Sequence, residues 1–110
     1  MGDSTEPRPI FSSFADDPAL APTIEAFVLG LAERIDAAQD AYSRRDLKEL
    51  ANLASALVGD AAAAGFEPLA SSASVIEATC LGQQLDPTYR GLVELTEIAR
   101  CIRLGHRGAT

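Results

Sequence analysis

Apolar residues recur at three- and four-residue steps along most of the chain, a spacing that predicts amphipathic helices. The first such stretch covers residues 18–43, where Asp17 is a candidate N-cap and Pro18 suits the first helical position. Pro22 and Gly30 leave open whether this stretch is one helix with a break or two helices. Its predicted core stripe consists of Leu20, Ile24, Phe27, Val28, Leu31, Ile35, Ala38 and Tyr42.

A second helix is predicted to begin after Asp46, which stands three residues before Glu49 in the spacing of a capping box. We expect Gly65 to end this helix, because glycine is the residue best suited to the left-handed position that follows a helix. The predicted core stripe consists of Leu47, Leu50, Leu53, Ala54, Leu57, Ala61 and Ala64.

Two further helices follow along the chain. One begins at Glu67-Pro68 and ends before a loop at residues 82–85. The other begins at Asp86-Pro87, and Gly105 is predicted to stop it. The predicted inward positions are Leu69, Ala73, Ile76 and Cys80 in the first, and Tyr89, Leu92, Leu95, Ile98 and Ile102 in the second.

No stretch shows the alternation of a β-strand, so the pattern predicts an all-α fold. Helices joined by short links favour an antiparallel up-down four-helix bundle, here with an extra short N-terminal helix. We expect one domain over residues 14–104, between a flexible tail of residues 1–13 and a C-terminal tail of residues 105–110. A chain of 110 residues is too short for a second core.

Composition agrees with helices and excludes several kinds of partner. Alanine occurs 20 times and aromatic residues make up 5%, which suits closely packed helices better than a β-sandwich. A net charge of −7 argues against nucleic acid, whose phosphates need clustered Lys and Arg. No apolar run is long enough to span a membrane, and the first 15 residues lack the apolar stretch of a signal peptide. We therefore expect a cytoplasmic protein.

The sequence contains few residues that could form a metal, cofactor or catalytic site. Two cysteines without a Cys-x-x-Cys spacing and a single histidine indicate neither a metal site nor a bound cofactor. Cys80 lies near the last interhelical loop and Cys101 about 15 residues beyond it, or ~22 Å along a helix, so we expect two small core residues and no disulfide. We predict no catalytic residue, and the chain is not expected to be an enzyme.

Two titratable residues have alternative interpretations. Asp60 lies toward the inward stripe of its helix, where we expect it to reach solvent or cap a neighbouring helix end. The alternative is a buried carboxylate with a perturbed pKa. His106 is expected to be a solvated residue of the C-terminal tail, without a catalytic or phosphoacceptor role.

The segment 46–66 resembles the histidine-containing phosphotransfer (HPt) domain family. That family carries, on the second long helix of a four-helix bundle, the pattern His-x-Leu-Lys-Gly-(small)-Ala-x-x-x-Gly-(apolar). The resemblance covers about residues 20–104 and implies a two-component phosphorelay module. The matching residues are Leu57, Gly59, Ala61, Gly65 and Phe66, followed by Leu69, Ala73 and Glu77 on the next helix.

The sequence departs from this family at two positions that carry its chemistry. Ser55 stands where the family has its phosphorylated histidine, and Val58 where it has the lysine that steadies the phosphoryl group. A neutral imidazole attacks an aspartyl phosphate and can pass the group on, whereas a serine needs an adjacent general base. Without the lysine, no cation offsets the arriving charge. The resemblance therefore implies an HPt-like domain that is inactive in phosphotransfer.

At 100° per residue, a strip of small and nearly uncharged residues surrounds Ser55. The resemblance implies that a response-regulator receiver domain, or a protein related to histidine kinases, docks on this strip, and that Gly59 permits a close approach. Three alternatives stay open: a helix surface that is bland because alanine favours helices, a homodimer that buries the strip, and phosphotransfer through another residue. The basic cluster Arg44, Arg45 and Lys48 either steers an acidic partner or is only solvated. The predicted docking face is Lys48, Ala51, Asn52, Ser55, Val58, Gly59 and Ala62.

Overall fold

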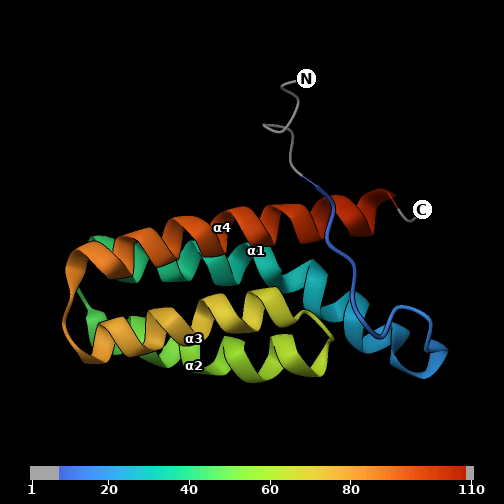
Figure 1. The fold of residues 1–110 in the computed structure, drawn as a ribbon, viewed down its shortest axis with the longest axis horizontal. Coiled ribbons are helices and arrows are strands. Elements are labelled where there is room, and N and C mark those ends of the chain that lie inside the picture. The colour runs from blue at the N-terminus through green and yellow to red at the C-terminus, as the bar shows by residue number, and fades with distance from the viewer. Residues whose placement is uncertain (1–7, 109–110) are drawn as a thin grey trace.

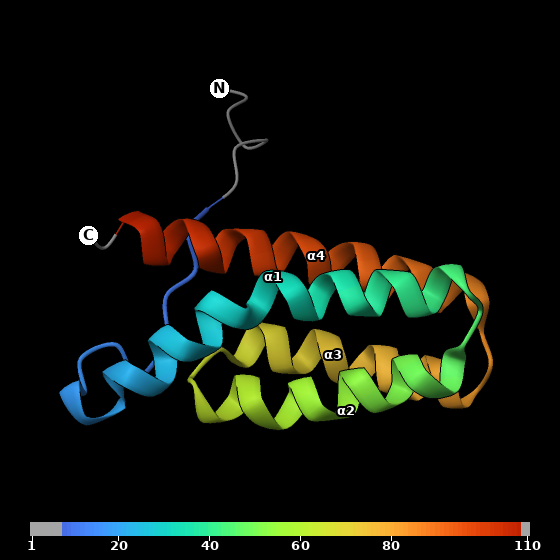
Figure 2. The same ribbon diagram turned by 180° about the vertical axis from the view of Figure 1, so that it is seen from behind.

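A computed structural model describes residues 8–108 and shows an all-α fold (Figure 1). The helices form a ring in which α1 packs on α2, α2 on α3, α3 on α4, and α4 on α1. Figure 2, the view from behind, also shows α1 beside α4 in one layer and α2 beside α3 in the other. The prediction of a four-helix bundle is therefore confirmed. The elements are the 3-10 turn η2 (Pro18–Leu20), α1 (Ala21–Ser43), α2 (Leu47–Ala63), α3 (Glu67–Leu81) and α4 (Leu85–Gly108).

The first predicted stretch is one continuous helix preceded by a short turn. The carboxylate of Asp17 accepts a hydrogen bond of 3.0 Å from the amide of Ala19, and so caps η2 as predicted. Pro22 lies in the first turn of α1, where its missing amide proton costs no helical hydrogen bond. α1 runs through Gly30 without a break, which answers the question that the sequence left open.

The three turns between helices share one hydrogen-bond pattern. After α2, Gly65 has a φ of 84°, and the amide of Phe66 reaches back to the carbonyl of Ala61, which makes a Schellman motif. The same pattern ends α1 and α3, with Arg45 at φ 58° and Gln83 at φ 55° in the left-handed position. Gly65 therefore ends α2 as predicted, while Arg45 and Gln83 occupy the left-handed position after α1 and α3 although they carry side chains.

Most of the predicted core positions are buried, and one is wrong. Tyr89 was predicted to face inward, but 53% of its surface is exposed. The neighbouring Thr88 takes the inward position instead, fully buried, and its hydroxyl donates a 2.8 Å hydrogen bond to that of Thr79 on α3. A threonine satisfied in this way can replace an apolar residue in the core, a substitution that the hydrophobic pattern does not reveal.

The ends of α4 also differ from the prediction. The helix begins at Leu85, so that Asp86 lies in its first turn, and it continues past Gly105 to Gly108. The predicted stop at Gly105 and a tail beginning there were therefore wrong; residues 109–110 lie outside the described part. A Cβ at Gly105 would come 2.6 Å from the carbonyl oxygen of Ile10, so this glycine makes room for the chain that crosses it.

That crossing chain corrects the predicted N-terminal tail. We call residues 8–17 the N-terminal segment. The amide of Ile10 donates to the carbonyl of Cys101 at 3.0 Å, and the amide of Ser13 donates to the carbonyl of Gly65 at 2.8 Å. Residues 8–13 thus lie against the bundle, because the ends of α2 and α4 offer them backbone acceptors. Residues 1–7 of the predicted tail lie outside the described residues.

None of the helices between residues 8 and 108 has the length and apolar character to cross a membrane.

We predict that Gly65→Ala lowers the free energy of unfolding by about 2 kcal/mol, because a side chain is strained at positive φ and its Cβ would meet Ser12 and Phe14. Gly30→Ala is the matched control. It places a Cβ in open space inside a helix, and it is expected to raise stability by about 0.5–1 kcal/mol. Urea unfolding followed by circular dichroism measures both. Equal effects of the two variants would contradict the strained turn.

Candidate functional site

The middle of α2 presents Ser55 to solvent. The flanks of this helix differ, because Leu50, Ala54 and Leu57 are buried in the core while Ser55 is exposed. The Ser55 hydroxyl has no hydrogen-bond partner among the described residues. A group placed at this position is therefore available to a partner.

Four of the seven residues predicted for the docking face are exposed, and three are not. Lys48, Asn52, Ser55 and Gly59 lie on the surface as expected. Val58 and Ala62 are half-buried, and Ala51, with 7% exposure, belongs to the core, so its place on the docking face was wrong.

The reason is the position of α3. α2 packs more extensively on α3 than on α1, and small side chains on this flank let the two helices come close. The exposed strip is consequently rotated away from α3 and gains Ala56 and Ala63. We define the Ser55 surface as Lys48, Asn52, Ser55, Ala56, Gly59 and Ala63.

Gly59 lies on the Ser55 surface with open space around it. A Cβ built there meets no heavy atom within 4 Å. Packing within the bundle therefore does not require a glycine at this position. Its effect is to leave the helix backbone accessible one turn after Ser55.

The charged residues beside the Ser55 surface mostly pair within the chain. Asp60 lies 2.9 Å from Arg34 of α1, and 61% of its side chain is exposed, so the expectation of a solvent-reaching residue is confirmed and the buried carboxylate is excluded. Such an exposed ion pair adds at most about 1 kcal/mol. Arg44 pairs with Asp40 at 3.0 Å, and Arg45 lies over the ring of Tyr42 at 4.9 Å.

Lys48 is the one cation of the predicted basic cluster that forms neither an ion pair nor a cation–π contact within the described range. The cluster is therefore less positive toward a partner than its sequence indicates.

A groove of about 500 Å³ borders the Ser55 surface where α2 begins and α3 ends. Leu81, with 72% exposure, is the most exposed large apolar residue beside it. Leu81 was not among the predicted site residues, because it lies off the inward stripe of α3; an apolar residue out of register with its helix was the available signal. The lining residues are Arg45, Leu47, Lys48, Ala51, Asn52, Cys80, Leu81 and Gln83.

His106, the single histidine of the sequence, lies elsewhere. It belongs to α4, not to a tail, and it is half-buried beside Ile10 and Phe66 under the N-terminal segment. α2 and α4 occupy diagonal corners of the ring and form no direct interface within the described residues. The structure therefore does not bring His106 to Ser55.

Both cysteines are free and buried, as expected for small core residues. Burial raises the pKa of the Cys80 thiol, against a smaller lowering by its hydrogen bond with Thr88. Burial also raises the pKa of Cys101, and the nearby carboxylate of Glu97 raises it further. Among the residues that the structure describes, no three metal-ligating side chains come together.

Thiol accessibility tests the corrected surface. At about pH 8 the raised pKa values keep Cys80 and Cys101 protonated, so they are expected to react slowly with a disulfide reagent. Ser55→Cys should add one thiol that reacts about 100-fold faster, whereas Ala51→Cys should add a slower one, because only 7% of Ala51 is exposed. Equal rates for the two introduced cysteines would show that Ala51 is open to solvent.

A comparison with known proteins identifies the family to which this four-helix bundle belongs. The family model described as Hpt domain matches residues 23–103, which is most of the chain. No curated protein matches the chain, and no solved structure does. The matched range includes all of α2 and α3 and most of α1 and α4. The chain therefore belongs to the Hpt domain family, whose members are modules of two-component phosphorelay signalling.

Proposed function

We propose that this Hpt domain binds a receiver domain through the Ser55 surface and does not itself carry a phosphoryl group. The observation that supports this most directly is the exposed serine in the middle of α2, at the position that the resemblance aligns with the family's histidine. We place this function in the cytoplasm.

The residues around Ser55 lack the groups that phosphoryl transfer requires. A serine hydroxyl becomes a competent nucleophile only beside a general base, and His106 lies on the diagonally opposite helix. Val58 provides no cation on the adjacent turn, and Lys48 is seven residues from Ser55, or about 10 Å along the helix. A phosphoserine ester, if formed, would also be too stable to pass the group on.

The same surface suits recognition. Its side chains are small and carry one charge, on a chain with a net charge of −7, so an acidic receiver meets less repulsion here than elsewhere. Gly59 leaves the backbone open to a closely packed partner helix. The adjacent groove adds an apolar contact at Leu81 beside Lys48, and an apolar centre with a polar rim is typical of protein interfaces.

Binding is tested with purified receiver domains of the source organism, each immobilised and titrated with the chain. Ala56→Glu adds a bulky anion to the Ser55 surface and is expected to weaken binding at least tenfold. Ala32→Glu is the matched control: it makes the same exchange at an exposed position of α1 and should leave the affinity unchanged.

Two outcomes count against docking. Binding to no receiver contradicts the proposal, and so does equal weakening by both variants. Sedimentation of the free chain identifies the alternative homodimer, because a dimer that Ala56→Glu dissociates and Ala32→Glu does not would occupy the Ser55 surface itself.

Phosphoryl transfer is tested with a radiolabelled, phosphorylated receiver. The native chain is expected to gain no acid-labile label, because it lacks both the imidazole and the lysine. The double variant Ser55→His/Val58→Lys should gain label, because Ser55 is exposed and a half-buried lysine stem at position 58 can extend its ammonium to solvent. Label on the native chain would overturn the proposed inactivity. Ala32→His is the control, because it places a histidine at an exposed position of α1 away from the Ser55 surface.

A further inference from the structure

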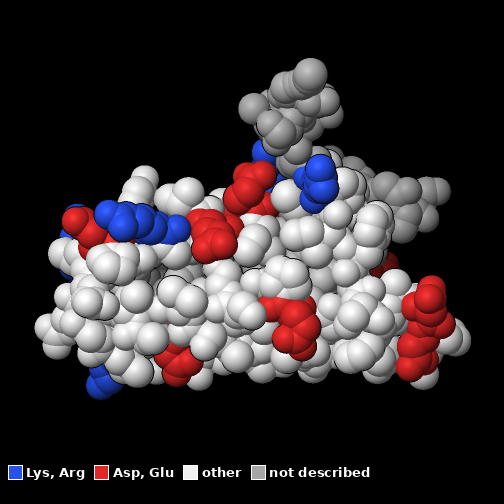
Figure 3. Space-filling view, in the orientation of Figure 1, with Lys and Arg blue, Asp and Glu red and all other residues white. Residues whose placement is uncertain are grey.

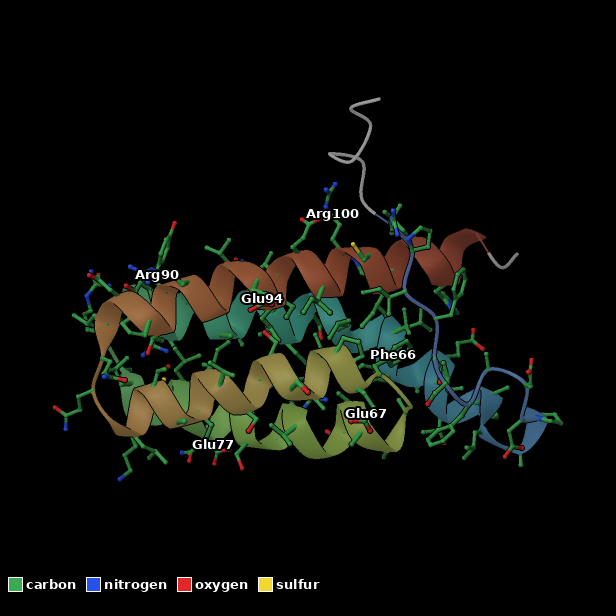
Figure 4. All side chains as sticks on the ribbon, viewed as in Figure 1. Phe66, Glu67, Glu77, Arg90, Glu94 and Arg100 are labelled. Carbon is green, nitrogen blue, oxygen red and sulfur yellow. The ribbon has the colours of Figure 1, made fainter. Side chains whose placement is uncertain are left out.

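The outward face of α4 carries a stripe of exposed residues. Within this stripe, the only ion pair among the described residues joins Arg100 to Glu97 of the same helix at 3.3 Å, so that pairing with a second copy would have these two side chains exchange or share this contact. Tyr89 and Val93 expose 53% and 51% of their surface at its centre. Figure 3 shows cationic and anionic side chains following one another along this helix, and Figure 4 shows Arg90 and Arg100 projecting from α4 on the side away from α3. We define the α4 stripe as Asp86, Tyr89, Arg90, Val93, Glu97 and Arg100, all exposed.

We propose that a second copy of the chain covers the α4 stripe, with the two α4 helices antiparallel and a two-fold axis at Val93. In this arrangement residues equally far before and after Val93 face each other. Asp86, seven residues before, faces Arg100, seven residues after. Symmetry makes this opposite-charge pair twice.

The charges between these ends fit the same register. Arg90, three residues before Val93, comes beside Glu97, four residues after it. A parallel pairing in register would instead place each of these charged residues against its own copy, which is repulsive at every one. The order of charges along α4 therefore selects the antiparallel arrangement.

The centre of the stripe is apolar and adjoins a groove. Tyr89 lies beside Tyr42 of α1, with ring centroids 5.7 Å apart, and a groove of about 370 Å³ separates the two helices there. The groove extends along α4 to Thr96 and Glu97. A copy placed across the two-fold axis can lay its own Val93 and Tyr89 against this groove, which gives an apolar centre within a charged rim.

The stripe is short. It ends where the N-terminal segment crosses α4 at Cys101, and Asp86 to Arg100 spans about 21 Å of helix. A contact of this length belongs to the small and weak class of interfaces, so we expect a dimer that forms in the micromolar range.

Pairing through α4 does not depend on receiver docking. Because α2 and α4 lie at diagonal corners, pairing through α4 leaves the Ser55 surface of both copies open. The dimer then presents two docking surfaces, and binding at both would raise the apparent affinity for a dimeric partner.

Sedimentation equilibrium from about 10 µM to about 500 µM tests the pairing. The native chain should show a concentration-dependent dimer. Arg100→Glu alone and Asp86→Arg alone should each raise the dissociation constant at least tenfold, because each places like charges together twice. The double variant Asp86→Arg/Arg100→Glu restores opposite charges and should return the constant to within about threefold of the native value.

Lys48→Glu is the matched control, since it changes the net charge as Arg100→Glu does but lies on the Ser55 surface. It should leave the dimer intact. Circular dichroism of each variant verifies that the bundle is folded. A native chain that stays monomeric at every concentration overturns the proposal. So does a dimer that Lys48→Glu dissociates and Arg100→Glu does not, or a charge exchange that fails to restore pairing.

Discussion

The left-handed turn at Gly65 is the constraint on which the arrangement of the bundle depends. Its positive φ reverses the chain after α2 and lets Phe66 bond back to Ala61, so that α3 returns directly along α2. The same turn brings Phe66 into the core, where its ring stacks on that of Phe27 at 5.7 Å. The carbonyl of Gly65 then accepts the N-terminal segment at Ser13. One backbone conformation thus fixes two helices, an aromatic contact and a crossing chain.

The close pairing of α2 with α3 in turn fixes the direction in which α2 faces solvent. Ala51 and Ala62 on one flank lie against or near α3, and this contact turns Ser55 outward. Small side chains make the approach possible, since larger ones at these positions would hold the helices apart. The alanine content that suggested helices therefore also determines the position of the candidate site.

Local signals in the sequence predicted the four helices and three of their ends, because Asp17, Asp46 and Gly65 act through neighbours only a few residues away. Features that depend on distant segments were not predictable in this way. From the sequence alone, Gly105 is expected to end the helix. The structure shows a different reason for the glycine, because the N-terminal segment crosses α4 there and leaves no room for a side chain. Ala51 and Ala56 are both alanines of α2, and their side chains do not differ. Only the position of α3 decides that Ala51 is buried while Ala56 is exposed. For the candidate site, the motif indicated Ser55 and its turn. Leu81 was visible in the sequence only as an apolar residue out of register, and its place beside the Ser55 surface depends on how α3 packs on α2.

Partner recognition and phosphoryl transfer, the two parts of the family's function, depend on the fold in different ways. The orientation of the Ser55 surface follows from packing on the buried flank of α2, so a sequence that keeps the α2–α3 contact keeps the same positions of α2 exposed to solvent. In the function that we propose, the transfer chemistry depends instead on two single side chains: Ser55 is exposed, and Val58 is half-buried against the core at a site where a lysine could keep its stem packed and its charge in water. Exchanging a histidine and a lysine for these two residues would remove a nucleophile and a cation, while Leu50, Ala54 and Leu57 keep the buried side of α2 in the core. A bundle of this kind can therefore lose phosphotransfer while the surface that a partner recognises stays in place.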